Sequence, residues 1–188
     1  MAARSPHHLL TYAEYLTLER DSGTKHEWCA GQVYAMAGGT PEHARLSARV
    51  IAALLAALRG RGCEVFSSDL KIRVQATGLA TYPDATVVCG SIQAATDDPN
   101  AVVNPTCIVE VLSPGTEAYD RGEKLWHYQQ IAELRAVLFV AQDCRRLEVV
   151  ARSAEDAWSR SSVEGDGSLS LGTLGVTLSI GDVFGPAA

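Results

Sequence analysis

The chain has 188 residues, of which 47% are hydrophobic and 20% charged, and its formal net charge is −6 at pH 7. This length and composition are typical of one globular domain, so we expect a single domain over residues 1–188, with about the first ten residues and the last few mobile. The acidic balance argues against a strong non-specific DNA-binding protein. The acidic balance is still compatible with nucleic-acid binding through a local basic strip, or through metal ions that offset carboxylates.

The apolar runs and the cysteines indicate where in the cell the protein is expected. No N-terminal stretch has the charged start and apolar region of a signal peptide, and no apolar run approaches about 18 residues, so we expect no membrane partner. The cysteines are odd in number and scattered, mostly within apolar strands. We therefore expect reduced, packed thiols in a cytoplasmic protein. Because no Cys-x-x-Cys is present, we also expect no structural zinc site. The five are Cys29, Cys63, Cys89, Cys107 and Cys144.

The first predicted elements are a helix and a hairpin. Thr11 and Glu14 have the spacing of a capping box, so a helix should begin there and end near residues 21–23. Residues 26–39 alternate enough to form a hairpin that turns at Ala30 and Gly31.

A second helix is predicted to begin at Pro41, because Thr40 can cap it and proline is favoured at the first helical position. It should end near Arg59, and residues 91–105 should form a polar loop. The other expected elements are strands at 63–66, 69–74, 81–90 and 106–112, a helix over about 117–131, and strands at 136–141, 146–152, 157–163 and near Leu169 and Val176. These elements predict a mixed α/β fold with helices flanking a sheet.

A carboxylate interrupts the most apolar strand. Glu110 lies within the run 107–112, where an unpartnered charge would cost several kcal/mol. Asp84 follows Pro83 at the start of another apolar strand that could pair beside it. Two carboxylates held close repel each other unless a cation lies between them, and oxygen ligands suit Mg²⁺ or Mn²⁺. We therefore predict a metal shared by Asp84 and Glu110.

The helix after this strand offers a cation. Asp120, Lys124, His127 and Tyr128 are spaced to share one helical face. If the helix folds back over the sheet, the Lys124 ammonium comes near the two carboxylates. There it could stabilise developing negative charge or position a water molecule.

The order Pro83-Asp84, Glu110 and then a lysine resembles the P-D…(D/E)-x-K signature of restriction-endonuclease-like proteins. The chain is most similar to the Uma-two family of nucleases within that superfamily. The segments that carry the similarity run from about Tyr12 to about Val150: "KHEWCAGQVYAMAG", "PEHARL", "SSDLKIRV", "TYPDATVVCG", "VEVLSPGTEAYDRGEKLWHY" and "LFVAQD". Leu112 occupies the position where the general signature has lysine, and the Uma-two pattern takes its lysine from the following helix.

The resemblance implies a restriction-endonuclease-like α/β fold, a mixed sheet flanked by helices, and a metal-dependent endonuclease that uses Mg²⁺ or Mn²⁺. It implies the following roles: Asp84 and Glu110 as metal ligands with the carbonyl of Val111 as an extra ligand, Lys124 as the catalytic cation, Glu27 as a further acid, and His43 as a hydrogen-bond partner of a bound water or phosphate. Lys71, Asp120 and Tyr128 are weaker candidates around the site.

Plainer roles are open for the same residues. Glu110 could be a structural acid paired with Arg73 or Lys124. Glu27 could be a cross-strand partner of Lys25 or Arg45. Asp97 and Asp98 look like a solvated turn, Asp69 and Lys71 fit strand positions on a solvent face, and His7 and His8 lack partners at metal-ligand spacing.

Two other functions compete with a nuclease. The Leu112 departure and the acidic balance allow a nuclease-like module that binds nucleic acid or a partner without cutting. Paired carboxylates could also serve a glycosidase, which ranks last because three tryptophans show no sugar-stacking cluster.

The expected partner is nucleic acid, DNA rather than RNA. A small phosphate-binding strip would come from Lys71, Arg73, Arg121 and Lys124. A nuclease of this size often cuts two strands as a homodimer, which the superfamily makes reasonable.

Overall fold

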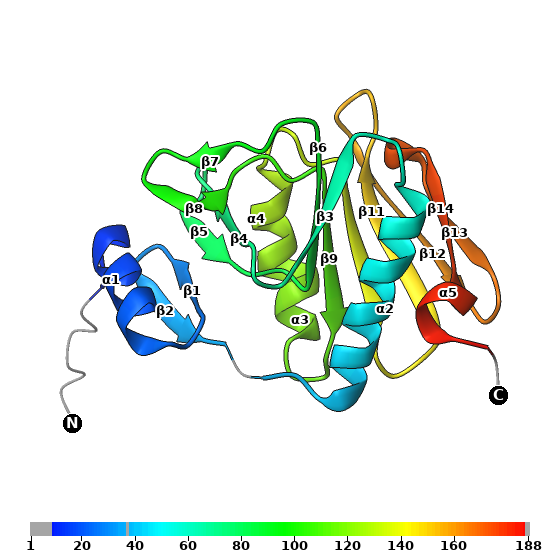
Figure 1. Cartoon of the computed structure of the whole chain (residues 1–188), viewed down its shortest axis with the longest axis horizontal. Helices are drawn as coiled ribbons and strands as arrows, with labels where there is room; N and C mark the ends of the chain where they lie inside the picture. The colour runs from blue at the N-terminus through cyan, green and yellow to red at the C-terminus, as the bar shows by residue number, and fades with distance from the viewer. Residues whose placement is uncertain (1–8, 37, 187–188) are drawn as a thin grey trace.

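The computed structural model describes residues 9–36 and 38–186. Its strands form two six-stranded sheets and a separate two-stranded hairpin, with helices packed against them (Figure 1). This arrangement confirms the predicted mixed α/β fold. The predictions for the chain ends, including the His7–His8 pair, fall mostly or wholly outside the described residues.

The first sheet follows α1 (Tyr12–Ser22), which begins at the predicted Thr11–Glu14 capping box. Its strand order is β2-β1-β5-β4-β8-β7. The bounds are β1 (His26–Cys29), β2 (Gln32–Ala35), β4 (Lys71–Val74), β5 (Leu79–Thr81), β7 (Ala94–Ala95) and β8 (Asp98–Val102). The hairpin turns at Ala30 and Gly31 as predicted, and both have positive φ (48° and 94°).

The prediction of a polar loop over 91–105 is wrong, because β7 and β8 lie within it. Asp98 is buried rather than part of a solvated turn. Its Oδ2 accepts hydrogen bonds from Lys71 Nζ and from the Tyr12 hydroxyl, both at 2.9 Å. Its polarity is thus satisfied inside the protein, which local composition cannot reveal.

The second sheet has the order β12-β11-β10-β9-β6-β3. The bounds are β3 (Cys63–Ser67), β6 (Ala85–Cys89), β9 (Cys107–Leu112), β10 (Ala136–Ala141), β11 (Arg146–Arg152) and β12 (Trp158–Glu164). Strands β9 and β10 are parallel and the other pairs antiparallel, so the sheet is mixed, as expected. All of β9 is buried, because both faces of the sheet are covered.

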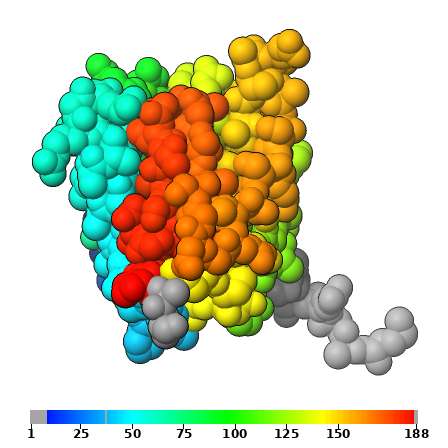
Figure 2. All heavy atoms as spheres, turned by 90° about the vertical axis from the view of Figure 1, so that its right-hand side faces the viewer, coloured from blue at the N-terminus to red at the C-terminus, as the bar shows by residue number. Residues whose placement is uncertain are grey.

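One face of this sheet packs against α2 (Pro41–Ala57), the hairpin of β13 (Ser168–Leu171) and β14 (Val176–Ser179), and α5 (Ile180–Phe184). A short 3-10 turn, η2 (Gly172–Leu174), links the two strands of that hairpin. Figure 2 shows the hairpin and α5, in orange and red, beside α2 in cyan. Cys107, Val109 and Val111 of β9 point into this core.

The other face of the sheet packs against a helical segment made of α3 (Glu117–Tyr119), a π-helical turn η1 (Asp120–Lys124) and α4 (Leu125–Gln129). Ile108 and Leu112 of β9 join this second core. Since side chains alternate along a strand, Glu110 also faces the helical segment. The predicted helix over 117–131 is thus present, but it is interrupted by π-helical geometry, which often marks functional sites.

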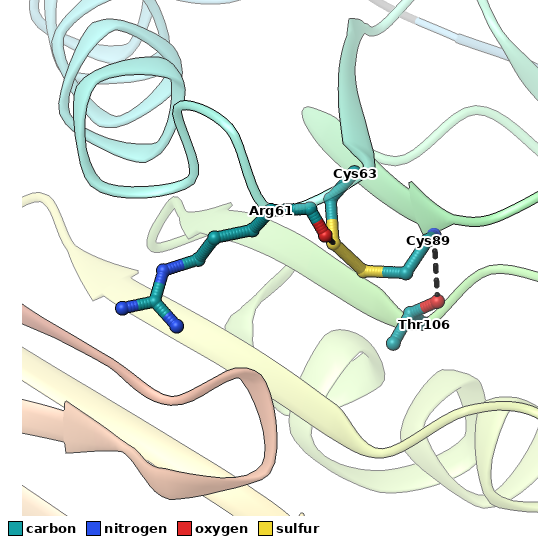
Figure 3. The surroundings of a disulfide bond; sticks show 4 residues. All are labelled: Arg61, Cys63, Cys89 and Thr106. Atoms are coloured by element: carbon teal, nitrogen blue, oxygen red, sulfur yellow. Dashed lines mark hydrogen bonds between the residues drawn. A yellow bond between two sulfur atoms is a disulfide. The ribbon is translucent and has the colours of Figure 1, made fainter.

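The prediction of five reduced thiols is wrong for Cys63 and Cys89, which form a disulfide between paired strands β3 and β6 (Figure 3). The backbone N–H of Cys89 also donates to Thr106 Oγ1 at 3.0 Å. Spacing along the chain gives no sign of this pairing, because the β3–β6 register brings the two cysteines together. The cytoplasmic location was inferred from reduced thiols, and that premise does not hold for this pair.

No helix within the described residues is long and apolar enough to cross a membrane.

Candidate active site

A cleft of about 660 Å³ lies between the first sheet, the N-terminus of α2, the end of β9 and the helical segment 117–129. Every residue that the sequence predicted as catalytic or metal-binding lines it. They are Glu27, His43, Asp84, Glu110, Val111 and Lys124. They come from both sheets and two helical segments, so the fold gathers residues spread over about half of the chain.

The two predicted metal ligands come from adjacent strands. In the antiparallel β6–β9 pair, Ala85 lies opposite Val109, which places Asp84 beside Glu110 one step further along. The backbone N–H of Val111 donates to Asp84 Oδ2 at 2.7 Å. This hydrogen bond holds the Asp84 carboxylate at the end of β9.

Glu110 is almost fully buried, with 4% of its surface exposed. Burial raises the pKa of its carboxyl to about 8, and the negative charges of Asp84 and Asp120 add to the rise, while Lys124 and Tyr128 act against it. The Tyr128 hydroxyl donates to Oε1 at 2.6 Å, which confirms that this tyrosine lies next to the site. Lys124 and Tyr128 therefore do not fully offset the cost of burying a charged Glu110 carboxylate. An added cation would favour the charged form.

The Lys124 ammonium lies at the centre of three carboxylates. Its Nζ lies 3.0 Å from Glu110 Oε1, 3.1 Å from Glu27 Oε1 and 3.5 Å from Asp120 Oδ1. Burial opposes its charge, but the surrounding acids outweigh burial and raise the pKa of the ammonium. Of the two structural partners considered for Glu110, Lys124 is the one in contact, whereas Arg73 pairs with Asp97.

Glu27 reaches the site from β1 and is 8% exposed. Besides Lys124, it accepts hydrogen bonds from the hydroxyls of Thr81 and, at 3.3 Å, Tyr119. The alternative prediction that Glu27 pairs with Lys25 or Arg45 is wrong, because Lys25 pairs with Asp69 and Arg45 with Glu42. Sequence reasoning missed Thr81 and Tyr119, because nothing local links their hydroxyls to an acid on β1.

His43 lies in the first turn of α2, where Thr40 caps the helix by accepting from the His43 N–H at 3.2 Å. Its Nε2 lies 3.3 Å from Asp84 Oδ2. The hydrogen bond to Asp84 raises the pKa of the His43 ring, and the Glu110 charge and the Val111 backbone add to this effect, against the opposing influence of burial. His43 therefore lies against both the Asp84 carboxylate and the end of β9.

Residues 12–181 match the family Uma2, whose description reads "Putative restriction endonuclease". The chain belongs to the Uma2 family. This membership supports a nuclease function and confirms the family resemblance drawn from the sequence.

Two related proteins and one solved structure align with this chain over most of their lengths. The uncharacterized protein slr1290 of Synechocystis sp. is 32% identical over 180 residues, covering 96% of this chain and 94% of that protein. A second uncharacterized Synechocystis protein, sll1609, is 29% identical over 158 residues, covering 84% of this chain and 89% of its own. A crystal structure from Anabaena variabilis, described as "a putative nuclease belonging to DUF820", has a TM-score of 0.75 at 16% identity and covers 93% of this chain and 97% of its own. That likeness supports the fold.

The oxygen donors of this Uma2 chain fit a hard divalent cation. Two neighbouring carboxylates, Asp84 and Glu110, border the same cleft as the Val111 backbone. Three of the site's acids share the Lys124 ammonium, and burial raises the pKa of Glu110 to about 8, so a further cation would favour its ionised form. Carboxylates, a carbonyl and water are the ligand set that Mg²⁺ and Mn²⁺ prefer.

The predicted phosphate-binding strip is wrong. Lys71 is buried against Asp98 rather than lining a solvent face, Arg73 pairs with Asp97, and Arg121 is held by Glu117 and Glu148. Lys124 is enclosed by its three acids. Lys71, Arg73 and Arg121 therefore serve ion pairs outside the cleft, and Lys124 is the member of the predicted strip that lines it.

Proposed function

We propose that the protein is a metal-dependent endonuclease that hydrolyses phosphodiester bonds, with DNA as its substrate. The observation that carries this proposal is the convergence of Asp84, Glu110 and Lys124 on one cleft. The Uma2 description, which names restriction endonucleases, supports DNA as the polymer.

Asp84, Glu110 and the Val111 carbonyl would hold Mg²⁺ or Mn²⁺, which when bound lowers the pKa of a water molecule and offsets phosphate charge. The protein's own residues supply the rest. Lys124 keeps its proton because acids surround it, and its ammonium stabilises the negative charge that develops on the phosphate.

His43 adds a hydrogen-bond donor at the other side of Asp84. Because its pKa is raised, its ring carries a proton over a wider pH range than an ordinary histidine. A protonated ring beside the metal ligands would bind a phosphate oxygen by a charge-assisted hydrogen bond. No covalent intermediate is implied, since the nucleophile is water.

The test combines binding and cleavage. Calorimetry with Mg²⁺ and Mn²⁺ is run on the wild type, on Glu110→Ala and on Asp69→Asn, a control at an exposed acid outside the cleft. The same samples are then incubated with plasmid DNA and with RNA, with and without EDTA. We expect the wild type and the control to bind metal and cut DNA, and Glu110→Ala to do neither.

Failure has two separate forms. If no metal binds at millimolar concentration, the metal site is refuted and Glu110 is a structural acid held by Lys124 and Tyr128. If metal binds and neither nucleic acid is cut, yet a gel shift shows that DNA binds, the chain is a nuclease-like binding module. The enclosure of Lys124 by three carboxylates is the observation that favours this second function.

We also propose that the active form is a homodimer, because cleavage of both strands of a duplex needs two sites of opposite polarity. Light scattering during size-exclusion chromatography, with and without a short DNA duplex, measures this directly. A monomer that cuts both strands would contradict it.

A further inference from the structure

A second cluster of metal-binding side chains lies on the wall of the cleft. Cys29 of β1, Glu123 of η1 and His127 of α4 each offer a ligand atom, and these atoms all lie within 4.8 Å of one another. Cys29 Sγ is 3.6 Å from His127 Nε2, and Glu123 Oε1 is 3.9 Å from the same nitrogen. None of these residues belongs to the group formed by Asp84, Glu110 and Lys124.

The spacing of Cys29 and His127 fits a tetrahedral ion. Zinc–sulfur bonds of about 2.3 Å and zinc–nitrogen bonds of about 2.0–2.1 Å place the two ligand atoms about 3.6 Å apart at a tetrahedral angle. The Cys29–His127 separation equals this value. The Glu123 side chain is 66% exposed, so a small rotation can bring its oxygen a few tenths of an ångström closer.

His127 is also oriented as a ligand. Its ring is buried, and Nδ1 lies 2.7 Å from Thr77 Oγ1. When Nδ1 donates its proton to this hydroxyl, Nε2 presents its lone pair toward Cys29 and Glu123. Metal-binding histidines almost always have such a partner on their second nitrogen. Burial lowers the pKa of the ring, which favours the neutral form that binds metal.

We propose that Cys29, Glu123 and His127 form a zinc-binding site with three protein ligands and a fourth position open to the cleft. A thiolate and an imidazole select zinc over magnesium, whereas the all-oxygen set at Asp84 and Glu110 suits magnesium. Cys29 and Glu123 both line the cleft, so a water or substrate atom can complete the tetrahedron.

The site would join two elements that build the catalytic cleft. Cys29 lies two residues after Glu27 on β1, and Glu123 directly precedes Lys124. Zinc bound here would therefore fix the strand that carries Glu27 to the helical segment that carries Lys124. The sequence pattern argued against zinc because no Cys-x-x-Cys is present, but these ligands come together only in the folded chain.

Binding must release a proton. Burial, together with nearby acids, raises the pKa of the Cys29 thiol, so the metal-free thiol is protonated at neutral pH. The sulfur–hydrogen bond breaks, the thiolate lone pair binds the ion, and the proton goes to solvent. Zinc affinity should therefore rise with pH.

Cobalt(II) is the spectroscopic probe for the test, because a thiolate ligand gives a charge-transfer band. Metal-free wild type, Cys29→Ser, Glu123→Gln and Cys144→Ser are titrated with Co²⁺ in excess Mg²⁺, and zinc affinity is measured by competition. Cys144 is an exposed free thiol and serves as the matched control.

We expect one equivalent of cobalt with the thiolate band in the wild type and in Cys144→Ser, no band in Cys29→Ser, and affinity at least about 10-fold weaker in Glu123→Gln. Glu123 is exposed, so that variant should keep its fold. Saturation at about 100 times the dissociation constant should also raise the wild-type Tm by roughly 5–10 °C.

No band in the wild type, a band that persists in Cys29→Ser, or unchanged affinity in Glu123→Gln each overturns the proposal. The Asp84→Asn variant should keep the band, because Asp84 belongs to the other ligand set. Zinc binding can therefore fail while the nuclease proposal stands, and the reverse also holds.

Discussion

Replacing Lys124 with methionine tests the central ion cluster. The change keeps a long, unbranched side chain and removes only the ammonium, so it leaves no large cavity. It would leave Glu27, Glu110 and Asp120 without the cation that lies 3.0 to 3.5 Å from each of them.

The loss of folding stability in Lys124→Met follows from the burial of this cluster. The side chains of these three acids are 5–11% exposed and that of Lys124 is 6% exposed, so water does little to replace the lost charge. Removing one partner of a buried ion pair costs about 3–5 kcal/mol. For a chain of this size that lowers Tm by roughly 6–20 °C.

The cost should depend on pH. Burial already raises the pKa of Glu110 and Asp120, and losing Lys124 would raise both further. An acid whose folded pKa exceeds its unfolded value reduces stability above the unfolded value, increasingly so until the folded value is passed. Below the wild-type folded pKa these acids are protonated in both folded proteins, so the difference between variant and wild type should grow mainly above that value, which for Glu110 is about 8.

The assay is thermal and urea unfolding at several pH values in EDTA, with Lys25→Met as the control. Lys25 pairs with Asp69 at side-chain exposures of 40% and 84%, so its loss should cost about 1 kcal/mol or less. Equal losses in the two variants, or a Lys124→Met loss that does not grow with pH, would refute the reasoning.

Three further changes have definite expected results. Cys63→Ser opens the disulfide to Cys89, which spans 26 residues, and should lower stability by about 3 kcal/mol without reductant; a difference that survives in dithiothreitol would contradict this. Asp84→Asn should lower the pKa of His43 toward its ordinary value, because the hydrogen bond from His43 to Asp84 raises it. The His43–Asp84 pair stabilises the fold fully below the ordinary histidine pKa and loses that effect as pH rises through the raised pKa of His43. An NMR titration that shows the same His43 pKa in Asp84→Asn would refute this interaction. Gly39→Ala places a Cβ 2.8 Å from His43 Nδ1, so the ring should move away from Asp84. The NMR titration should then show a lower pKa of His43, and thermal unfolding should show only a small loss of stability.

Local patterns in the sequence determined the helix starts and the two apolar strands at Asp84 and Glu110. Thr40 followed by Pro41, and the Thr11–Glu14 box, act within one helical turn, so their effect is readable without a fold. Glu110 stood out because a charge inside an apolar strand needs a partner wherever that strand lies. Lys124 followed from helical spacing together with the family resemblance.

Contacts between distant segments were decided by the tertiary structure alone. The β3–β6 register paired Cys63 with Cys89, and packing of the first sheet against the helical segment 117–129 brought Glu27 to Lys124. Arg73, predicted to meet phosphate, became an internal partner for the same reason. Composition and periodicity describe neighbours along the chain, whereas ion pairs, disulfides and ligand clusters depend on strand register and on which faces pack together. Those are set only when the whole chain buries its apolar surface.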